Sequence, residues 1–276
     1  EEKGYAIIEG ILTEDELKTA LEYFYDWLDS DEQIKQKHDK ISPHAIFKFY
    51  QAGHQRHAWY IRTRKSVQDA FKAILETDEL VVSYDGCCWL SKDLKKKDNI
   101  WTHTDQAPNK KGFRCYQGFV ALTTNEERTL VVYEGSHKQH EKYFEDRNMT
   151  HNKDWQLIDH DYLKTIEDKK RVVAAKAGSL VIWDSRTFHQ NQYGPHPEKR
   201  IVQYVSYLPT GNMTDKIFDK RLQYFADYRM TSHWAYPVKV NGLQPQTYGD
   251  KNSIIDYSKL KEPDLADMFE DIVKIL

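Results

Sequence analysis

The sequence predicts a mainly β protein whose strands are flanked by helices on both sides along the chain. Short runs rich in β-branched and aromatic residues recur between about residues 80 and 209, which is typical of many short strands. Apolar side chains repeat at helical spacing over residues 14–29, and a helical pattern returns after Pro209. The length of 276 residues allows one large or two small domains, each able to bury a core.

Two helices are predicted before the strands. Thr13 and Glu16 form the pattern of a capping box, in which two otherwise unpaired backbone N–H groups gain partners. A second helix is predicted from Val67 to Glu76, behind a cap at Ser66. Between these helices, the aromatic stretch from Phe47 to Ile61 lacks a helical period, so no helix is predicted there.

The predicted strands are interrupted by one long polar segment. They are Leu80 to Tyr84, Tyr116 to Leu122, Leu130 to Tyr133, Val172 to Lys176, Leu180 to Trp183 and Ile201 to Leu208. The segment from Glu134 to Lys170 is predicted to be a long insertion, of the kind that often carries specificity.

After the strands, a final helix is predicted to begin at Pro263. We expect a single domain over residues 1–276, with a sheet core over about 80–209, a helical support over 1–79 and a helical extension over 210–276.

Composition and charge exclude several classes of function. Lys and Arg number 40 against 43 Asp and Glu, a formal net charge of −3, so the chain has no global basic field for nucleic acid or anionic lipid. Three cysteines suit a reducing compartment, and no apolar run approaches the roughly 18 residues that span a bilayer. We predict a cytoplasmic monomer or homodimer that binds neither nucleic acid nor membrane, although a leader could precede Glu1.

Few catalytic motifs are available in this chain. It lacks the nucleophile elbow G-x-S-x-G, the dinucleotide motif G-x-G-x-x-G, the P-loop, a C-x-x-C pair and an H-E-x-x-H helix. It does contain Trp101-Thr102-His103-Thr104-Asp105 at the end of an apparent strand. Because residues i and i+2 of a strand face the same side, His103 and Asp105 can present an imidazole and a carboxylate to one point.

His189, which follows a predicted strand and turn, is the strongest candidate for a third ligand. Two imidazoles and one carboxylate form the facial triad that holds non-haem Fe(II) and leaves open positions for a cosubstrate and dioxygen. Eleven residues later, Arg200 begins an apolar strand, and its guanidinium could receive a cosubstrate carboxylate through two parallel hydrogen bonds. The competing interpretation is a set of surface or hydrogen-bonded residues without a metal.

With these residues, the sequence resembles the phytanoyl-CoA dioxygenase family of Fe(II)- and 2-oxoglutarate-dependent oxygenases over roughly residues 4–209. The segments that carry the resemblance are Gly4 to Gly10, His103-x-Asp105, Leu122 to Thr124, Leu130 to Val132, Gly135-Ser136-His137, Gly178-Ser179, His189 and Arg200. The resemblance implies a double-stranded β-helix, or cupin-like jelly roll. It also implies that His103, Asp105 and His189 bind the iron, and that Arg200 binds the distal carboxylate of 2-oxoglutarate.

Three further residues are expected to contact 2-oxoglutarate. Lys48 lies in the aromatic stretch, where family members place a residue that reaches the cosubstrate, and Gln117 and Thr129 lie on strands that could line the barrel. The alternative for each is an ordinary surface or strand residue. His54 and His57 have a spacing that could suit zinc, but no companion ligand is close in sequence, so we interpret them as surface histidines.

The resemblance implies hydroxylation of an unactivated C–H bond in a small organic or acyl substrate, with release of succinate and carbon dioxide. Halogenating relatives need a vacant position for chloride, and Asp105 fills that position, so hydroxylation is favoured. The chain departs from the family at Tyr133-Glu134, where Pro usually precedes Gly-Ser-His, and it lacks the usual Asn-Gly over residues 125–129. These departures leave the substrate open.

A cluster of cations near the H-x-D motif would favour an anionic substrate if it bordered the pocket. Its members are Lys92, Lys95, Lys96, Lys97, Lys110, Lys111 and Arg114. Two other functions stay open: a jelly-roll binding module without turnover, and a cupin-like metal enzyme that does not use 2-oxoglutarate.

Overall fold

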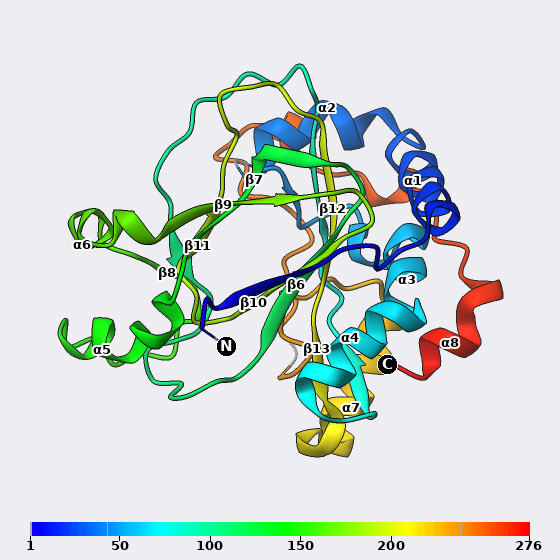
Figure 1. Cartoon of the computed structure of the whole chain (residues 1–276). Helices are drawn as coiled ribbons and strands as arrows, with labels where there is room; N and C mark the ends of the chain where they lie inside the picture. The colour runs from blue at the N-terminus through cyan, green and yellow to red at the C-terminus, as the bar shows by residue number, and fades with distance from the viewer. Residues whose placement is uncertain (1, 43, 238) are drawn as a thin grey trace. The chain divides into compact units, whose positions relative to one another are not determined.

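The computed structural model describes residues 2–42, 44–237 and 239–276, and Figure 1 traces the chain from its N-terminus to its C-terminus. The chain divides into two compact units. One unit is formed by the N-terminal segment up to Glu9 and by Leu90–Arg200, and the other by Gly10–Trp89 and Ile201–Leu276. The residues proposed above as metal ligands, and Arg200, all belong to the first unit.

The first unit is built on antiparallel strands. In one sheet β1 (Tyr5–Ile8), β10 (Leu180–Asp184) and β6 (Tyr116–Ala121) are neighbours in that order. In the other sheet the order is β8 (Gln156–Leu157), β5 (His103–Thr104), β11 (His189–Asn191), β7 (Asn125–Tyr133) and β9 (Lys170–Ala175). The pairings within each group are antiparallel. Two segments far apart in sequence, β5 and β11, therefore lie side by side.

The long insertion predicted between strands folds into a small layer of its own. It contains α5 (His140–Glu145), β8 and α6 (His160–Thr165), and β8 pairs with β5 at one edge of the five-stranded sheet; all three are drawn on the left of Figure 1. An apolar cluster joins it to the sheet; its buried members are Tyr133, Tyr143, Phe144, Ile158, Leu163 and Phe188. Successive residues along an extended chain face opposite sides of the sheet. Because Phe188 points into this cluster, the side chain of its neighbour His189 points to the opposite face. The insertion thus covers part of the outer face of the five-stranded sheet.

The second unit holds most of the helices. They are α1 (Glu14–Leu28), α2 (Glu32–Ile41), α3 (Arg56–Arg62), α4 (Lys65–Leu75), α7 (Asp215–Ala226) and α8 (Phe269–Val273). Its strands follow the orders β12 (Arg200–Val205), β4 (Cys87–Leu90), β2 (Ile46–Phe47) and, separately, β13 (Tyr207–Pro209), β3 (Leu80–Val82). Short strands between flanking helices confirm the predicted fold class.

The caps of the two predicted N-terminal helices differ in outcome. The capping box of α1 is confirmed, because the Thr13 hydroxyl accepts from the Glu16 backbone N–H and the Glu16 carboxylate accepts from that of Thr13. The cap predicted at Ser66 is wrong. Arg64 is the N-cap of α4, and the Ser66 hydroxyl donates instead to the carbonyl of Ile11 at 2.6 Å.

Two other helix predictions also need correction. The aromatic stretch predicted without a helix contains most of α3, where Ala58, Trp59 and Ile61 are all fully buried. A helix buried on several sides has no single apolar stripe, and its sequence therefore lacks the amphipathic period. The final helix, predicted from Pro263, is the short α8, which begins at Phe269.

The interpretation of His54 and His57 as surface histidines is wrong. Both side chains are completely buried in the second unit. The ring of His57 contacts that of Phe24 with centroids 5.1 Å apart, and the ring of His54 contacts that of Tyr84 at 4.9 Å. Burial lowers the pKa of each imidazole to about 3, so both are neutral packing residues.

Among the described residues, no helix is both long enough and apolar enough to cross a bilayer. The cellular location and the single-domain organisation stay predictions.

The apolar cluster predicts a large cost for truncating Phe144. This side chain is 1% exposed, so Phe144→Ala should lower the free energy of unfolding by about 3–5 kcal/mol through lost burial and the cavity left behind. Urea denaturation measures the change. Phe218→Ala, at a side chain that is 40% exposed, is the control and should cost well under half as much. Equal losses in the two variants would contradict the packing described here.

Candidate metal centre

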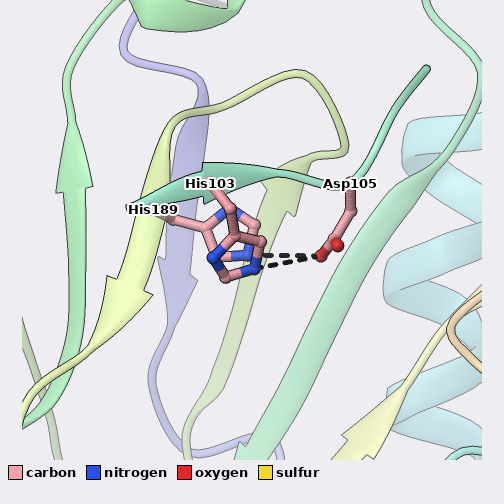
Figure 2. Close-up of side chains that lie close together, drawn as sticks. All are labelled: His103, Asp105 and His189. Atoms are coloured by element: carbon pink, nitrogen blue, oxygen red, sulfur yellow. Dashed lines mark ion pairs between the residues drawn. The ribbon is translucent and has the colours of Figure 1, made fainter. Parts of the chain in front are cut away.

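The three predicted ligands converge in the first unit. Strand β5 pairs with β11 so that His103 is directly opposite His189, and paired residues project to the same face. Asp105 follows β5. Its Oδ2 atom lies 3.7 Å from Nε2 of His103 and 3.4 Å from Nε2 of His189, and Figure 2 shows the three side chains pointing toward one another. Their ligand atoms all lie within 4.8 Å of one another, close enough to share one metal ion.

Backbone carbonyls fix the orientation of both imidazoles. Nδ1 of His103 lies 3.1 Å from the carbonyl oxygen of Trp101, and Nδ1 of His189 lies 2.9 Å from that of Thr187. A carbonyl can only accept, so each Nδ1 donates its proton to that carbonyl and each Nε2 faces Asp105. Burial, and next the neighbouring His189, lower the pKa of His103, which favours the neutral form that binds metals.

This set of donors fits a divalent cation. The Nε2 atoms of two imidazoles and a carboxylate oxygen face one point, and both imidazoles are 5% exposed. Such a group is the two-histidine, one-carboxylate pattern typical of non-haem Fe(II) sites. The residues present therefore suit the metal that the sequence predicts.

Gln117 holds the carboxylate ligand in place. Its side-chain N–H donates to Oδ2 of Asp105 at 3.0 Å from strand β6, so this bond links the two sheets of the first unit across the triad. The sequence did not predict this bond to a ligand side chain, and the expected contact of Gln117 with 2-oxoglutarate stays a prediction. Outer contacts of this kind orient metal ligands.

Gln190 fixes the segment that carries His103, and sequence analysis did not single it out. Its Oε1 atom accepts from the backbone N–H of Trp101 at 3.1 Å and from the Thr102 hydroxyl at 2.7 Å. No spacing or motif marks this residue, because its contacts depend on the pairing of β5 with β11. Gln190, next to His189, is thereby bonded to Trp101 and Thr102, which directly precede His103.

Arg200 is completely buried at the start of β12. Its guanidinium carbon lies 5.4 Å from the centre of the Phe119 ring. Phe119 and Gln117 are two residues apart on β6, so they share the face that reaches Asp105. Phe119 packs on Trp183 at 5.9 Å, and Trp183 packs on His189 at 5.4 Å. A continuous row of rings therefore connects the guanidinium to the triad.

The two remaining predicted contacts of 2-oxoglutarate lie in different surroundings. The hydroxyl of Thr129, on β7, is buried and donates to the carbonyl of Val173 at 2.9 Å. Lys48 is exposed and directly follows β2 in the second unit. A role of either residue in cosubstrate binding stays a prediction.

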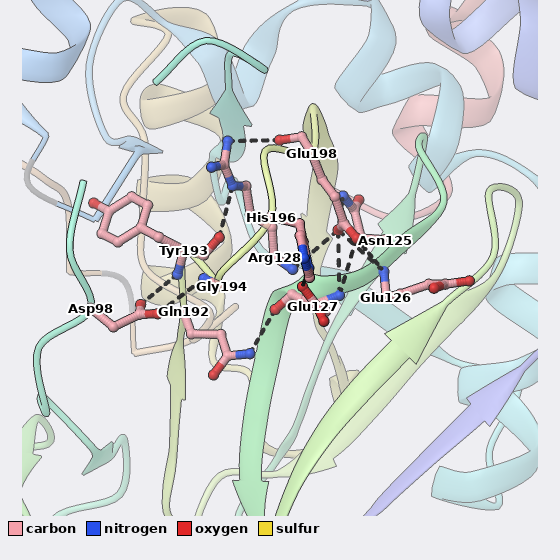
Figure 3. A network of polar contacts seen from close by, with 10 residues as sticks. All are labelled: Asp98, Asn125, Glu126, Glu127, Arg128, Gln192, Tyr193, Gly194, His196 and Glu198. Atoms are coloured by element: carbon pink, nitrogen blue, oxygen red, sulfur yellow. Dashed lines mark hydrogen bonds and ion pairs between the residues drawn. The ribbon is translucent and has the colours of Figure 1, made fainter. Parts of the chain in front are cut away.

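The half-buried carboxylate of Glu198 holds the loop before Arg200, as Figure 3 shows. Glu198 accepts hydrogen bonds from three successive backbone N–H groups, those of Glu126, Glu127 and Arg128, at 3.1–3.4 Å. The side-chain amide of Asn125 donates to the same carboxylate at 3.2 Å. Glu198 thus fastens the residues just before β12 to the start of β7.

The side chain of Arg128 completes this network. It is 3% exposed and donates to the backbone carbonyls of Tyr193 at 2.9 Å, Glu198 at 2.7 Å and Ser91 at 3.0 Å. Asp98 accepts from the backbone N–H groups of Tyr193 and Gly194, also drawn in Figure 3. The loop before the H-x-D strand and the loop before Arg200 are therefore both bound to the Arg128 side chain on β7.

Comparisons with known proteins agree with this geometry. The family model for phytanoyl-CoA dioxygenase matches residues 1–192. A curated relative, "Ava biosynthesis cluster protein O" of Aspergillus versicolor, is 29% identical over 204 residues, which cover 67% of this chain and 65% of that protein. The match thus spans less than two thirds of the relative's length.

Solved structures of similar fold include three with cosubstrate bound. EctD from S. alaskensis, with 2-oxoglutarate and 5-hydroxyectoine, is 17% identical with a TM-score of 0.53 over 76% of this chain and 74% of that one. HygX from Streptomyces hygroscopicus, with nickel and 2-oxoglutarate, is 10% identical with a TM-score of 0.52, over 76% of this chain and 84% of that one. The epimerase SnoN, with Fe3+, alpha ketoglutarate and nogalamycin RO, is 16% identical with a TM-score of 0.51, over 76% of this chain and 80% of that one. The shared fold is the predicted jelly roll.

The contacts of Glu198 predict a pH-dependent contribution to stability. Burial acts to raise the pKa of this carboxyl, but the hydrogen bonds from Arg128, Asn125 and their neighbours outweigh it and hold the pKa below its ordinary value. Glu198→Gln should lower the free energy of unfolding by about 1–2 kcal/mol at pH 7.

A carboxyl whose pKa is depressed on folding stabilises the fold above its unfolded pKa, near 4.3, and loses that effect as the pH falls through the folded pKa. The difference between wild type and Glu198→Gln should therefore shrink below about pH 4. Urea titrations at several pH values measure it. A difference that is constant from pH 7 to pH 3 would contradict the assignment of a charged acceptor.

Proposed function

The chain belongs to the phytanoyl-CoA dioxygenase family, and on that premise we propose that it is an Fe(II)- and 2-oxoglutarate-dependent oxygenase. The proposed reaction hydroxylates an unactivated C–H bond of a small organic or acyl substrate and releases succinate and carbon dioxide. The convergence of His103, Asp105 and His189 on one point carries the proposal. Support comes from proteins of similar fold that were crystallised with 2-oxoglutarate.

His103, Asp105 and His189 would hold the ferrous ion on one face and leave positions open for 2-oxoglutarate and dioxygen. When bound, the iron and its cosubstrate supply the oxidising chemistry, in which dioxygen decarboxylates 2-oxoglutarate and provides the oxygen atom of the new hydroxyl group. The chain itself orients the ligands. Carbonyls fix the imidazoles through Nδ1, and Gln117 fixes the carboxylate through Oδ2.

Arg200 would bind the distal carboxylate of 2-oxoglutarate. A guanidinium can donate two parallel hydrogen bonds to a carboxylate, and charge-assisted bonds are stronger where water is excluded. The side chain is fully buried, and the rings of Phe119 and Trp183 pack between it and His189. Apolar rings beside the guanidinium make its surroundings less polar, which strengthens a charge-assisted bond to the cosubstrate carboxylate.

The first test of the proposed function is spectroscopic. Anaerobic addition of Fe(II) and 2-oxoglutarate to metal-free protein should produce a visible charge-transfer band, because the keto acid chelates the ligated iron. Asp105→Ala and His103→Ala should lose the band, and both should lose succinate formation after oxygen is admitted. Wild-type protein that gives neither band nor succinate would favour the non-catalytic binding module instead.

The second test separates the cosubstrate from the metal. Arg200→Lys keeps the charge but removes the paired donors, so KM for 2-oxoglutarate should rise about tenfold or more while Fe(II) affinity is maintained. Arg200→Ala should raise it further. Circular dichroism checks that each variant folds. Undiminished turnover in folded Arg200→Ala would favour a cupin-like metal enzyme that does not use 2-oxoglutarate.

A further inference from the structure

We propose that Trp155 and Leu157, in the insertion, form the surface that contacts an uncharged, ring-containing part of the substrate beside the metal centre. This inference rests on the proposed function. It assigns a substrate class and two specificity-determining residues, neither of which is a metal or cosubstrate contact.

The first support is the register of the edge strand β8. It pairs with β5 so that Leu157 is opposite His103 and Gln156 is opposite Thr104. Directly paired residues project to the same face, so Leu157 shares the face of His103 and His189. Trp155 is two residues from Leu157 along the same extended segment and shares that side. Its ring centre lies 5.5 Å from that of His103.

The second support is the exposure of these two side chains. Trp155 is 40% exposed and Leu157 is 53% exposed, although the adjacent His103 is only 5% exposed. Ile158, the next residue, points the other way and is 2% exposed within the apolar cluster. Packing in the cluster therefore explains why Ile158 is apolar on the outer face. It does not explain why Trp155 and Leu157 are apolar on the face of the triad. Exposed apolar side chains beside a binding centre are typical of a ligand contact.

The third support concerns charge. Lys110 donates to Asp154, directly before Trp155, at 2.6 Å, and Lys111 donates to Glu145 at 2.7 Å. These two cations of the predicted cluster thus bind carboxylates of the protein, which weakens their attraction for an anionic substrate group. An indole offers a flat apolar face on which rings stack. An uncharged ring system fits this exposed apolar, partly aromatic surface better than an acid or a nucleotide.

The experiment screens candidate substrates by succinate formation with the Fe(II)-loaded protein. The panel contains indole, 2-naphthol and 9,10-anthraquinone as uncharged ring compounds, with palmitoyl-CoA and the free amino acids as the competing classes. We expect a ring compound to stimulate succinate formation. Its KM should rise about tenfold in Trp155→Ala, and less in Trp155→Phe, which keeps an aromatic face.

Binding is measured separately from turnover. Calorimetry with the Ni(II)- and 2-oxoglutarate-loaded protein gives the Kd of the stimulating compound, which should rise in Trp155→Ala and in Leu157→Ala. Val172→Ala is the matched control, because Val172 is 44% exposed on the opposite face of the same sheet and should leave both constants unchanged. Circular dichroism and Ni(II) affinity verify that each variant is folded.

The outcomes separate this inference from the proposed function. Absence of succinate together with absence of the charge-transfer band would mean that the proposed function fails. Stimulation only by palmitoyl-CoA or by amino acids would overturn the ring-compound assignment while the oxygenase stands, as would an unstimulated basal rate across the ring compounds. A ring compound whose KM and Kd are the same in wild type and in Trp155→Ala would overturn the role of Trp155.

Discussion

The pairing of β5 with β11 is the constraint on which the candidate centre depends. It places His103 opposite His189, so two imidazoles separated by 85 intervening residues emerge from one face of one sheet. Because side chains alternate along a strand, a slip of one residue would send one imidazole to the outer face and replace it with a neighbour. Gln190 opposes such a slip, since its side chain bonds to the backbone of Trp101 and the hydroxyl of Thr102 across the same pair of strands.

The two faces of the five-stranded sheet carry different kinds of side chains. The outer face carries Phe188 and Ile158 into the cluster that holds the insertion, and that packing stabilises the register from outside. The inner face carries the imidazoles, and the Gln117 amide reaches across from β6 to the carboxylate. Alternation along β8 extends the same division to the edge of the sheet. The insertion is therefore a structural support on one face and, in our proposal, a substrate surface on the other.

The sequence was sufficient for features that depend on residue type and local spacing. His103 and Asp105 are two residues apart, and His189 begins a strand, so the triad could be predicted without coordinates. The role assigned to Arg200, which also begins a strand, stays a prediction. Features that depend on contacts between distant parts of the chain could not be predicted in this way. The bond from the Gln117 amide to Asp105 depends on how two sheets face each other, so the sequence did not predict it. The burial of His54 and the all-round burial of α3 depend on packing that no local period reveals. The strand predicted from Leu130 in fact begins at Asn125. There Glu198, far along the chain, accepts hydrogen bonds from the Asn125 side-chain amide and from the backbone N–H groups of the next three residues.

The most direct test of the central claim is a crystal structure of the protein grown anaerobically with Fe(II), with anomalous data collected at the iron absorption edge. We expect one anomalous peak about 2.0–2.2 Å from Nε2 of His103, Nε2 of His189 and a carboxylate oxygen of Asp105, distances usual for such ligands. A peak bound elsewhere, or bound through Nδ1 of either imidazole, would contradict it.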